Sequence, residues 1–173
     1  MIVASRDYLD ETKVDPRRSW YKVVAPVRTS LEPVNDVYGE VIQELLARVN
    51  ATATTQRFSS LDEKLSQIGD LPDHWDGYDS PRPDENAVTL ARQAIRAAEI
   101  ARLLPTTVVA SAEGGVAICW DKGDKHAYIE FGNDLTAVSA MYSGHGEPIV
   151  AEFEPTASEI ERAFGEVRRF MRI

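Results

Sequence analysis

Apolar residues in the first half of the chain recur at every third or fourth position, the spacing of a helix with one buried face. The first such stretch predicts a helix from about residue 36 to Val49, capped at its start by Asn35 or Asp36. The next seven residues, 50–56, are polar or small and predict a linker. We therefore expect this first helix to be separate from the one that follows it.

Two further helices are predicted before the middle of the chain. Ser60 and Glu63 form a capping box, which predicts a short second helix that ends near Gly69. Asp84 can cap a third helix, which is rich in alanine and ends at about Leu103. Small alanine side chains allow such a helix to lie close to a sheet or to another helix.

The period changes to two between residues 106 and 153, which predicts β-strands. Five short runs of apolar residues are separated by short turn signals, and loops this short join antiparallel neighbours. We therefore predict a five-stranded antiparallel meander. Its turns are Glu113-Gly114-Gly115, Lys122-Gly123-Asp124, Gly132-Asn133-Asp134 and Ser143-Gly144-His145-Gly146.

Two-residue loops at the last three turns predict the register of the sheet. They place Ile129 opposite both Ile118 and Val138, and Ala140 opposite Ile149, so that the large aliphatic side chains share one face. The other face is then mixed in character and holds Cys119, Tyr128, Glu130, Ser139, Met141 and Glu152.

A last helix, capped by Thr156 or Ser158, carries an apolar stripe that can close the core. The predicted fold class is therefore α+β, with N-terminal helices, a five-stranded antiparallel β-meander and a C-terminal helix packed on one face of the sheet. Residues 1–35 are expected to form an extended arm that can contain one short strand, and residues 36–173 a single α+β domain.

Composition narrows the classes of function. The formal net charge of −9 disfavours nucleic acids and anionic membranes and favours basic partners. No stretch is apolar for long enough to cross a membrane, and the N-terminus does not resemble a signal peptide. Cys119 is the only cysteine, which suits a reducing compartment. We expect a cytoplasmic protein.

The most distinctive local sequence is Trp75-Asp76-Gly77-Tyr78, which we interpret as a structural turn with Trp75 largely buried. The aspartates around it lack the ligand spacing of a calcium loop, and the three histidines lack that of a zinc site. Cys119 has no evident activating group, and the predicted register places Asp121 rather than Cys119 opposite His126. We therefore expect no catalytic cysteine, no bound metal and no cofactor.

Four segments together resemble a loosely defined set of small uncharacterised bacterial proteins. The segments are LPDHWDGYDSPRPDENAVTLA, GGVAICW, AYIEFGND and AEFEPTASEIERAFGEVRRF, within residues 70–173. In such proteins a Trp-Asp/Asn-Gly-Tyr turn precedes a helix, and a glycine is typical where this chain has Leu135. The resemblance implies the fold and brings no activity or catalytic residues with it.

We expect a non-enzymatic interaction or accessory protein, of an antitoxin-like, immunity-like or adaptor kind, that binds a protein partner or a second copy of itself. The expected contact residues lie on the mixed face of the sheet and in the arm: Cys119, Tyr128, Glu130, Met141, Trp20 and Tyr21. The alternative is a small hydrolase or nuclease-like enzyme that uses carboxylates such as Asp76, Asp79 and Glu130.

Overall fold

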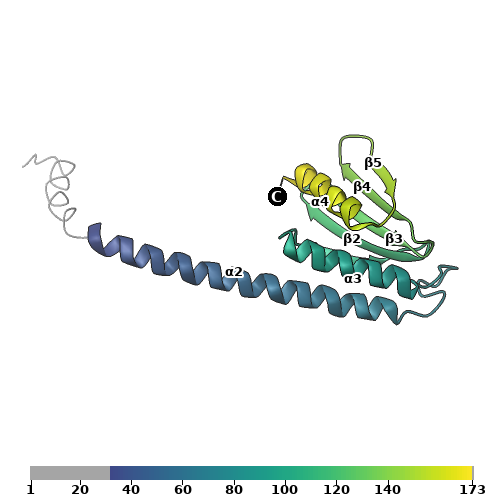
Figure 1. Ribbon diagram of the computed structural model, residues 1–173, viewed down its shortest axis with the longest axis horizontal. Helices are drawn as coiled ribbons and strands as arrows, with labels where there is room; N and C mark the ends of the chain where they lie inside the picture. Colours follow the sequence, from purple (N-terminus) through teal and green to yellow (C-terminus); the bar gives the residue numbers. More distant parts are fainter. Residues whose placement is uncertain (1–31, 173) are drawn as a thin grey trace, which may run out of the picture. The chain divides into compact units, whose positions relative to one another are not determined.

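The structure, a computed structural model, describes residues 32–172 of the chain and its side chains from residue 38 onward. The chain divides into two units, residues 1–50 and residues 51–173. The predicted arm lies outside the described residues, together with Trp20 and Tyr21, except that residues 32–35 are helical rather than extended. The elements, in chain order, are α2 (Glu32–Gly69), α3 (Glu85–Ile100), β1 (Thr107–Ala110), β2 (Gly115–Lys122), β3 (Lys125–Gly132), β4 (Ala137–Ser143), β5 (Ile149–Phe153) and α4 (Ala157–Met171) (Figure 1).

The helix α2 is continuous where two helices and a linker were predicted. The segment 50–56 contains neither glycine nor proline, so nothing in it breaks a helix. Its polar side chains are accommodated within the helix, since the Thr55 hydroxyl donates a hydrogen bond to the Ala51 carbonyl at 3.1 Å. The predicted capping residues Ser60 and Glu63 consequently lie inside α2.

The other two helices begin at or beside the predicted caps. The Asp84 carboxylate accepts a hydrogen bond from the Ala87 amide at 2.8 Å at the start of α3. The Thr156 hydroxyl accepts one from the Glu159 amide at 3.4 Å at the start of α4. Each side chain thereby satisfies an amide that has no partner within its own helix.

The five strands form one antiparallel sheet in the order β1-β2-β3-β4-β5, which confirms the predicted meander. Together with the preceding and following helices, this arrangement confirms the α+β fold class. Between β2 and β3 the register is as predicted, with Ile118 opposite Ile129 and Asp121 opposite His126. The two-residue turn at Gly123-Asp124 sets this register.

The predicted register of β4 is wrong by one residue against β3 and by one residue against β5. The β3–β4 turn contains three residues rather than two, since the Gly132 amide donates a hydrogen bond to the Thr136 carbonyl. Within this turn Leu135 adopts a left-handed conformation with φ of 66°. Ile129 therefore pairs with Ser139, and Met141 pairs with Ala127. The pairing of β4 with β5 is also shifted by one residue, so that Met141 rather than Ala140 lies opposite Ile149. The two shifts cancel for β5, whose side chains lie on the faces that were predicted for them.

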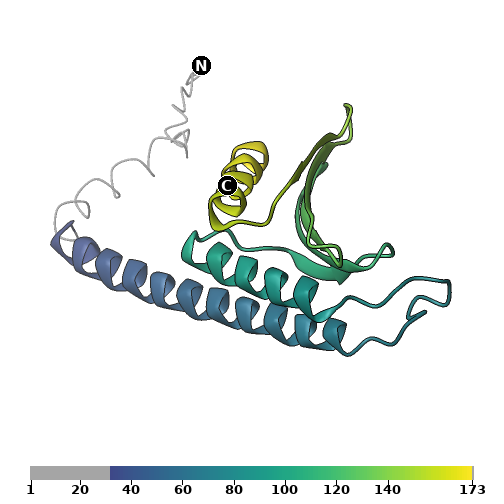
Figure 2. The same cartoon turned by 45° about the vertical axis from the view of Figure 1, so that its right-hand side comes forward.

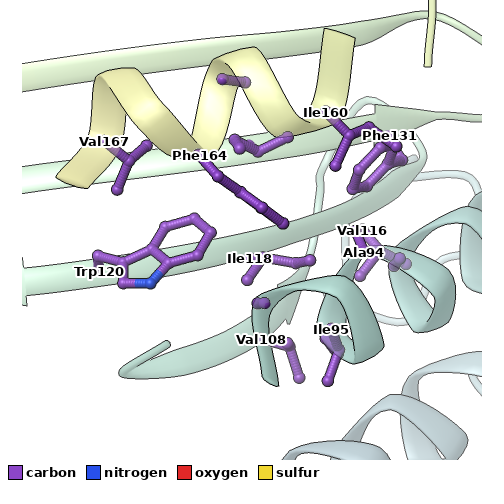
Figure 3. Close-up of a cluster of buried hydrophobic side chains, with 14 of the residues drawn as sticks. Ala94, Ile95, Val108, Val116, Ile118, Trp120, Phe131, Ile160, Phe164 and Val167 are labelled. Atoms are coloured by element: carbon purple, nitrogen blue, oxygen red, sulfur yellow. The ribbon is translucent and has the colours of Figure 1, made fainter. Parts of the chain in front are cut away.

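One face of the sheet forms the core with the helices. Figure 2 shows the sheet nearly edge-on, with α3 and α4 on the same side of it. Trp120, Ile118 and Phe131 are fully buried on this side, and the Phe164 ring of α4 packs edge-on against Trp120 at a centroid distance of 6.0 Å (Figure 3). The C-terminal stretch of α2 adds a layer through Phe58, Leu61, Leu65 and Ile68, which belong to the same apolar cluster.

Candidate interaction surface on the open face of the sheet

The face of the sheet opposite the core is left uncovered by the described helices (Figure 2). Because side chains alternate along a strand, the register identifies the residues that face outward. We call this surface the open face. Its residues are Thr107, Val109, Ala117, Cys119, Asp121, His126, Tyr128, Glu130, Val138, Ala140, Tyr142, Val150 and Glu152.

The open face combines apolar and acidic groups. Val109, Tyr128, Tyr142 and Val150 are exposed, and Val150 keeps 62% of its surface accessible. None of the open-face residues is a lysine or arginine, whereas three are carboxylates. Antiparallel sheets whose outer face meets only water usually alternate apolar-in and polar-out. The exposed tyrosines and valines depart from that pattern.

Three of the predicted contact residues lie on the open face, namely Cys119, Tyr128 and Glu130. The prediction for Met141 is wrong, since this side chain is 6% exposed and belongs to the apolar core. The extra residue in the β3–β4 turn reverses the two faces of β4. For the same reason Val138, which the sequence-based register placed on the aliphatic face opposite Ile129, lies on the open face, as does Tyr142.

A depression of about 580 Å³ opens at the end of the open face near the β1–β2 and β3–β4 turns. Its lining includes the tyrosine Tyr128 and three carboxylates, Glu113, Glu130 and Asp134, and contains no lysine or arginine. Hydrogen bonds from the hydroxyl and then the amide of Thr136 lower the pKa of Asp134. That carboxylate is therefore ionised at neutral pH, and the depression favours a positively charged group.

A second depression, of about 510 Å³, lies beside Leu135 and Pro155 at the start of α4. Glu154 is the only charged residue in its lining. Charged and convergent polar groups give a site its selectivity. This second depression therefore offers less basis for selective recognition than the acidic one.

The Trp75–Tyr78 turn is organised by its own aspartate. The Asp76 carboxylate accepts hydrogen bonds from the Ser80 hydroxyl at 2.6 Å and from the Tyr78 amide at 2.9 Å, and the first of these contributes most to lowering the pKa of Asp76. Gly77 adopts a positive φ of 78°. Trp75 is only partly buried, less than predicted, because the turn lies at the edge of the fold, and Tyr78 is 82% exposed.

The side chain of Asn133 connects the proline-rich segment 81–84, which follows this turn, to the sheet through hydrogen bonds. The Asn133 side chain accepts a hydrogen bond from the Asp84 amide at 2.8 Å and donates one to the Arg82 carbonyl at 2.9 Å. Gly114 packs beneath this side chain, where a β-carbon would come within 2.9 Å of Pro81. Three of the distinctive sequence segments therefore meet at one corner, beside the acidic depression.

At the other end of the open face, His126 and Asp121 form the predicted cross-strand pair. Their Nδ1 and Oδ1 atoms lie 2.6 Å apart, and the imidazole stacks on the Tyr142 ring at a centroid distance of 6.4 Å. Burial, followed by the negative charge of Asp121, raises the pKa of the Cys119 thiol to about 11. This thiol is protonated at neutral pH and is a poor nucleophile.

Among residues 32–172, no group of three or more His, Cys, Asp or Glu side chains could hold a metal ion. Within the same residues, no helix combines the length and the apolar character needed to cross a bilayer.

Comparison of the chain with protein-family models, with curated proteins and with solved structures finds no match.

Proposed function

We propose that the protein is a non-enzymatic binding module, of an antitoxin-like, immunity-like or adaptor kind, that docks a protein partner on the open face of its sheet. The observation that carries this proposal is the combination of exposed Tyr128, Tyr142 and Val150 with an adjoining acidic depression. Tyrosines supply large contact area at low cost in conformational entropy and are enriched where proteins bind one another.

The charges of the open face indicate the chemistry of the partner. Asp121, Glu130 and Glu152 lie on this face without a lysine or arginine among its residues. Two copies placed face to face would bring like charges together, which disfavours self-association through this surface. A separate partner with a lysine or arginine for the depression and apolar side chains for the tyrosines fits better.

The hydrolase alternative depends on three carboxylates, and the structure gives two of them other contacts. Asp76 holds its own turn through Ser80 and the Tyr78 amide. The Asp79 carboxylate lies 3.0 Å from the His74 ring nitrogen and is fully exposed to solvent. Glu130 lines the acidic depression. A binding role makes fuller use of the open face.

Selection from a displayed library of random peptides tests the proposal and does not require the natural partner to be identified first. We expect the immobilised full-length protein to enrich peptides in which lysine or arginine adjoins apolar residues. Binding should weaken at high salt, because the charges on this face are accessible to ions.

Variants then locate the binding surface. Tyr128→Ser and Glu130→Lys should each lower the affinity for the selected peptides by about tenfold or more, as loss of an interface anchor does. Ile100→Ser and Glu99→Lys make the same kinds of change at exposed positions of α3 and should have no effect. Equal binding by all four variants, or enrichment of peptides without basic residues, would contradict the proposal.

A further inference from the structure

The α2 segment within the first unit carries a stripe of apolar side chains that the described chain does not cover. Residues 38–49 contain six large apolar side chains that keep between 48% and 64% of their surface exposed. We call them the α2 stripe. They are Tyr38, Val41, Ile42, Leu45, Leu46 and Val49.

Helical geometry places these six side chains on one side of the helix. At 3.6 residues per turn, they fall within an arc of about 140°. Glu40, Ala47 and Ala51 occupy the opposite side. An amphipathic helix of this kind normally buries its apolar side, so the α2 stripe calls for a partner.

The α2 stripe is distinct from the stripe that joins the core. The core stripe, which runs from Phe58 to Ile68, follows helical spacing, and its continuation toward the N-terminus falls on Thr54, Ala51 and Ala47. These residues are polar or small. The α2 stripe therefore occupies other helical positions and forms a surface of its own.

We propose that the α2 stripe pairs with the α2 stripe of a second copy of this chain, in an antiparallel helix pair. The exposed area of the six side chains suits such a pair, because two copies would bury on the order of 1,000 Å², the lower range for a specific interface. This association uses a surface separate from the open face of the sheet, so a dimer would present two partner-binding sheets.

The charges that flank the stripe favour the antiparallel arrangement. One edge of the stripe carries Glu44 and Arg48, which form an ion pair at 2.7 Å within the helix. In an antiparallel pair the same edges of the two helices meet, so Glu44 of each copy approaches Arg48 of the other. In a parallel pair this edge would meet the edge that holds Leu46 and Asn50, which has no charge.

Sedimentation equilibrium of the full-length chain tests the association. We expect a dimer whose dissociation constant rises at least about tenfold in Leu45→Glu, because the variant places a charge within the apolar contact. Ala47→Glu introduces the same charge on the opposite side of the same helix and should leave the dissociation constant unchanged. Circular dichroism should show equal helix content in both variants.

Charge exchange tests the orientation. Glu44→Arg and Arg48→Glu should each weaken the dimer by about threefold or more, since each sets like charges against one another, and the double exchange should restore it. A monomer at every concentration, or equal effects of Leu45→Glu and Ala47→Glu, would overturn the proposal. A monomer in which hydrogen exchange shows the stripe protected would also overturn it, by indicating that residues 1–31 cover the stripe.

Discussion

Two adjacent glycines allow the motif-bearing segments to pack together at the corner of the sheet. Gly114 has a φ of 83°, and a β-carbon there would lie 2.7 Å from the Asn133 side chain and 2.9 Å from Pro81. Gly115 has a φ of 138°, and a β-carbon there would lie 2.4 Å from the Phe131 carbonyl oxygen. Each position therefore combines a conformation unfavourable for other residues with a lack of space.

Replacing Gly114 with alanine should lower the free energy of unfolding by about 1–3 kcal/mol, through the strained backbone and the displacement of Asn133. Urea denaturation measures the change. Gly165→Ala is the matched control, because Gly165 lies within α4 and a β-carbon there meets nothing within 4 Å. This control should raise stability by up to about 1 kcal/mol. Equal stability of Gly114→Ala and the wild type would show that the corner can relax.

The Cys119 thiol should react slowly at neutral pH. Only the thiolate attacks alkylating reagents, and burial raises the pKa of Cys119 from 9.0 to about 11. At pH 8 the rate of alkylation should be about a hundredfold lower than that of an unperturbed thiol, and it should keep rising until the pH passes the raised pKa. A rate profile with its midpoint near 9 would contradict the burial of this thiol.

The raised pKa of Cys119 also makes the stability of the fold depend on pH in the alkaline range. A thiol whose pKa is raised in the folded state releases its proton more readily when the chain is unfolded. The contribution of the protonated thiol to the free energy of unfolding is therefore fully present below pH 9.0 and is lost as the pH rises toward about 11. Replacing Cys119 with serine should remove this part of the alkaline destabilisation.

Turn length explains which elements could be predicted from the sequence. The Gly123-Asp124 turn has the expected two residues, so the pairing of β2 with β3 and the outward position of Tyr128 were predictable. The β3–β4 turn places Leu135, rather than a glycine, in the left-handed conformation. A leucine gives no sign of that conformation in the sequence, and the turn therefore appeared one residue shorter.

The strain at Leu135 can be measured. Leu135→Gly should raise the free energy of unfolding by up to about 1 kcal/mol, because glycine adopts a φ of 66° without a steric penalty. Leu135→Ala removes the side chain and keeps the β-carbon, so it should give no such gain. If both variants lose stability equally in urea denaturation, the packing of the leucine side chain outweighs the backbone strain.

The continuous α2 helix was missed for a different reason. Apolar periodicity stops at residues 50–56, but a helix ends where a residue breaks it or where another structure competes, and neither occurs in this segment. A helix therefore ends where its apolar periodicity ends only if a capping or helix-breaking residue stands at that point. The sequence thus predicted two separate helical stretches and not the single helix that contains both.

For the molecule as a whole, the two faces of the sheet differ in burial and in composition. The side covered by α3 and α4 contains the large buried side chains, among them Trp120 and Phe131, and accounts for stability. The open side exposes tyrosines and carboxylates beside the acidic depression. The sequence predicted part of this surface through Cys119, Tyr128 and Glu130. It could not predict the depression, because the turns that form it have geometry that periodicity does not reveal.

The central claim is that the open face contacts a separate protein partner in the cell. Photo-crosslinking tests it most directly, with a photoreactive amino acid placed at Tyr128 in the cells that naturally make the protein. The same amino acid at Ile100, which is exposed on α3, is the matched control. We predict a discrete crosslinked species with another protein from position 128 and none from position 100. Crosslinks from position 128 that are no more frequent than those from position 100, or that join only two copies of this chain, would contradict the account.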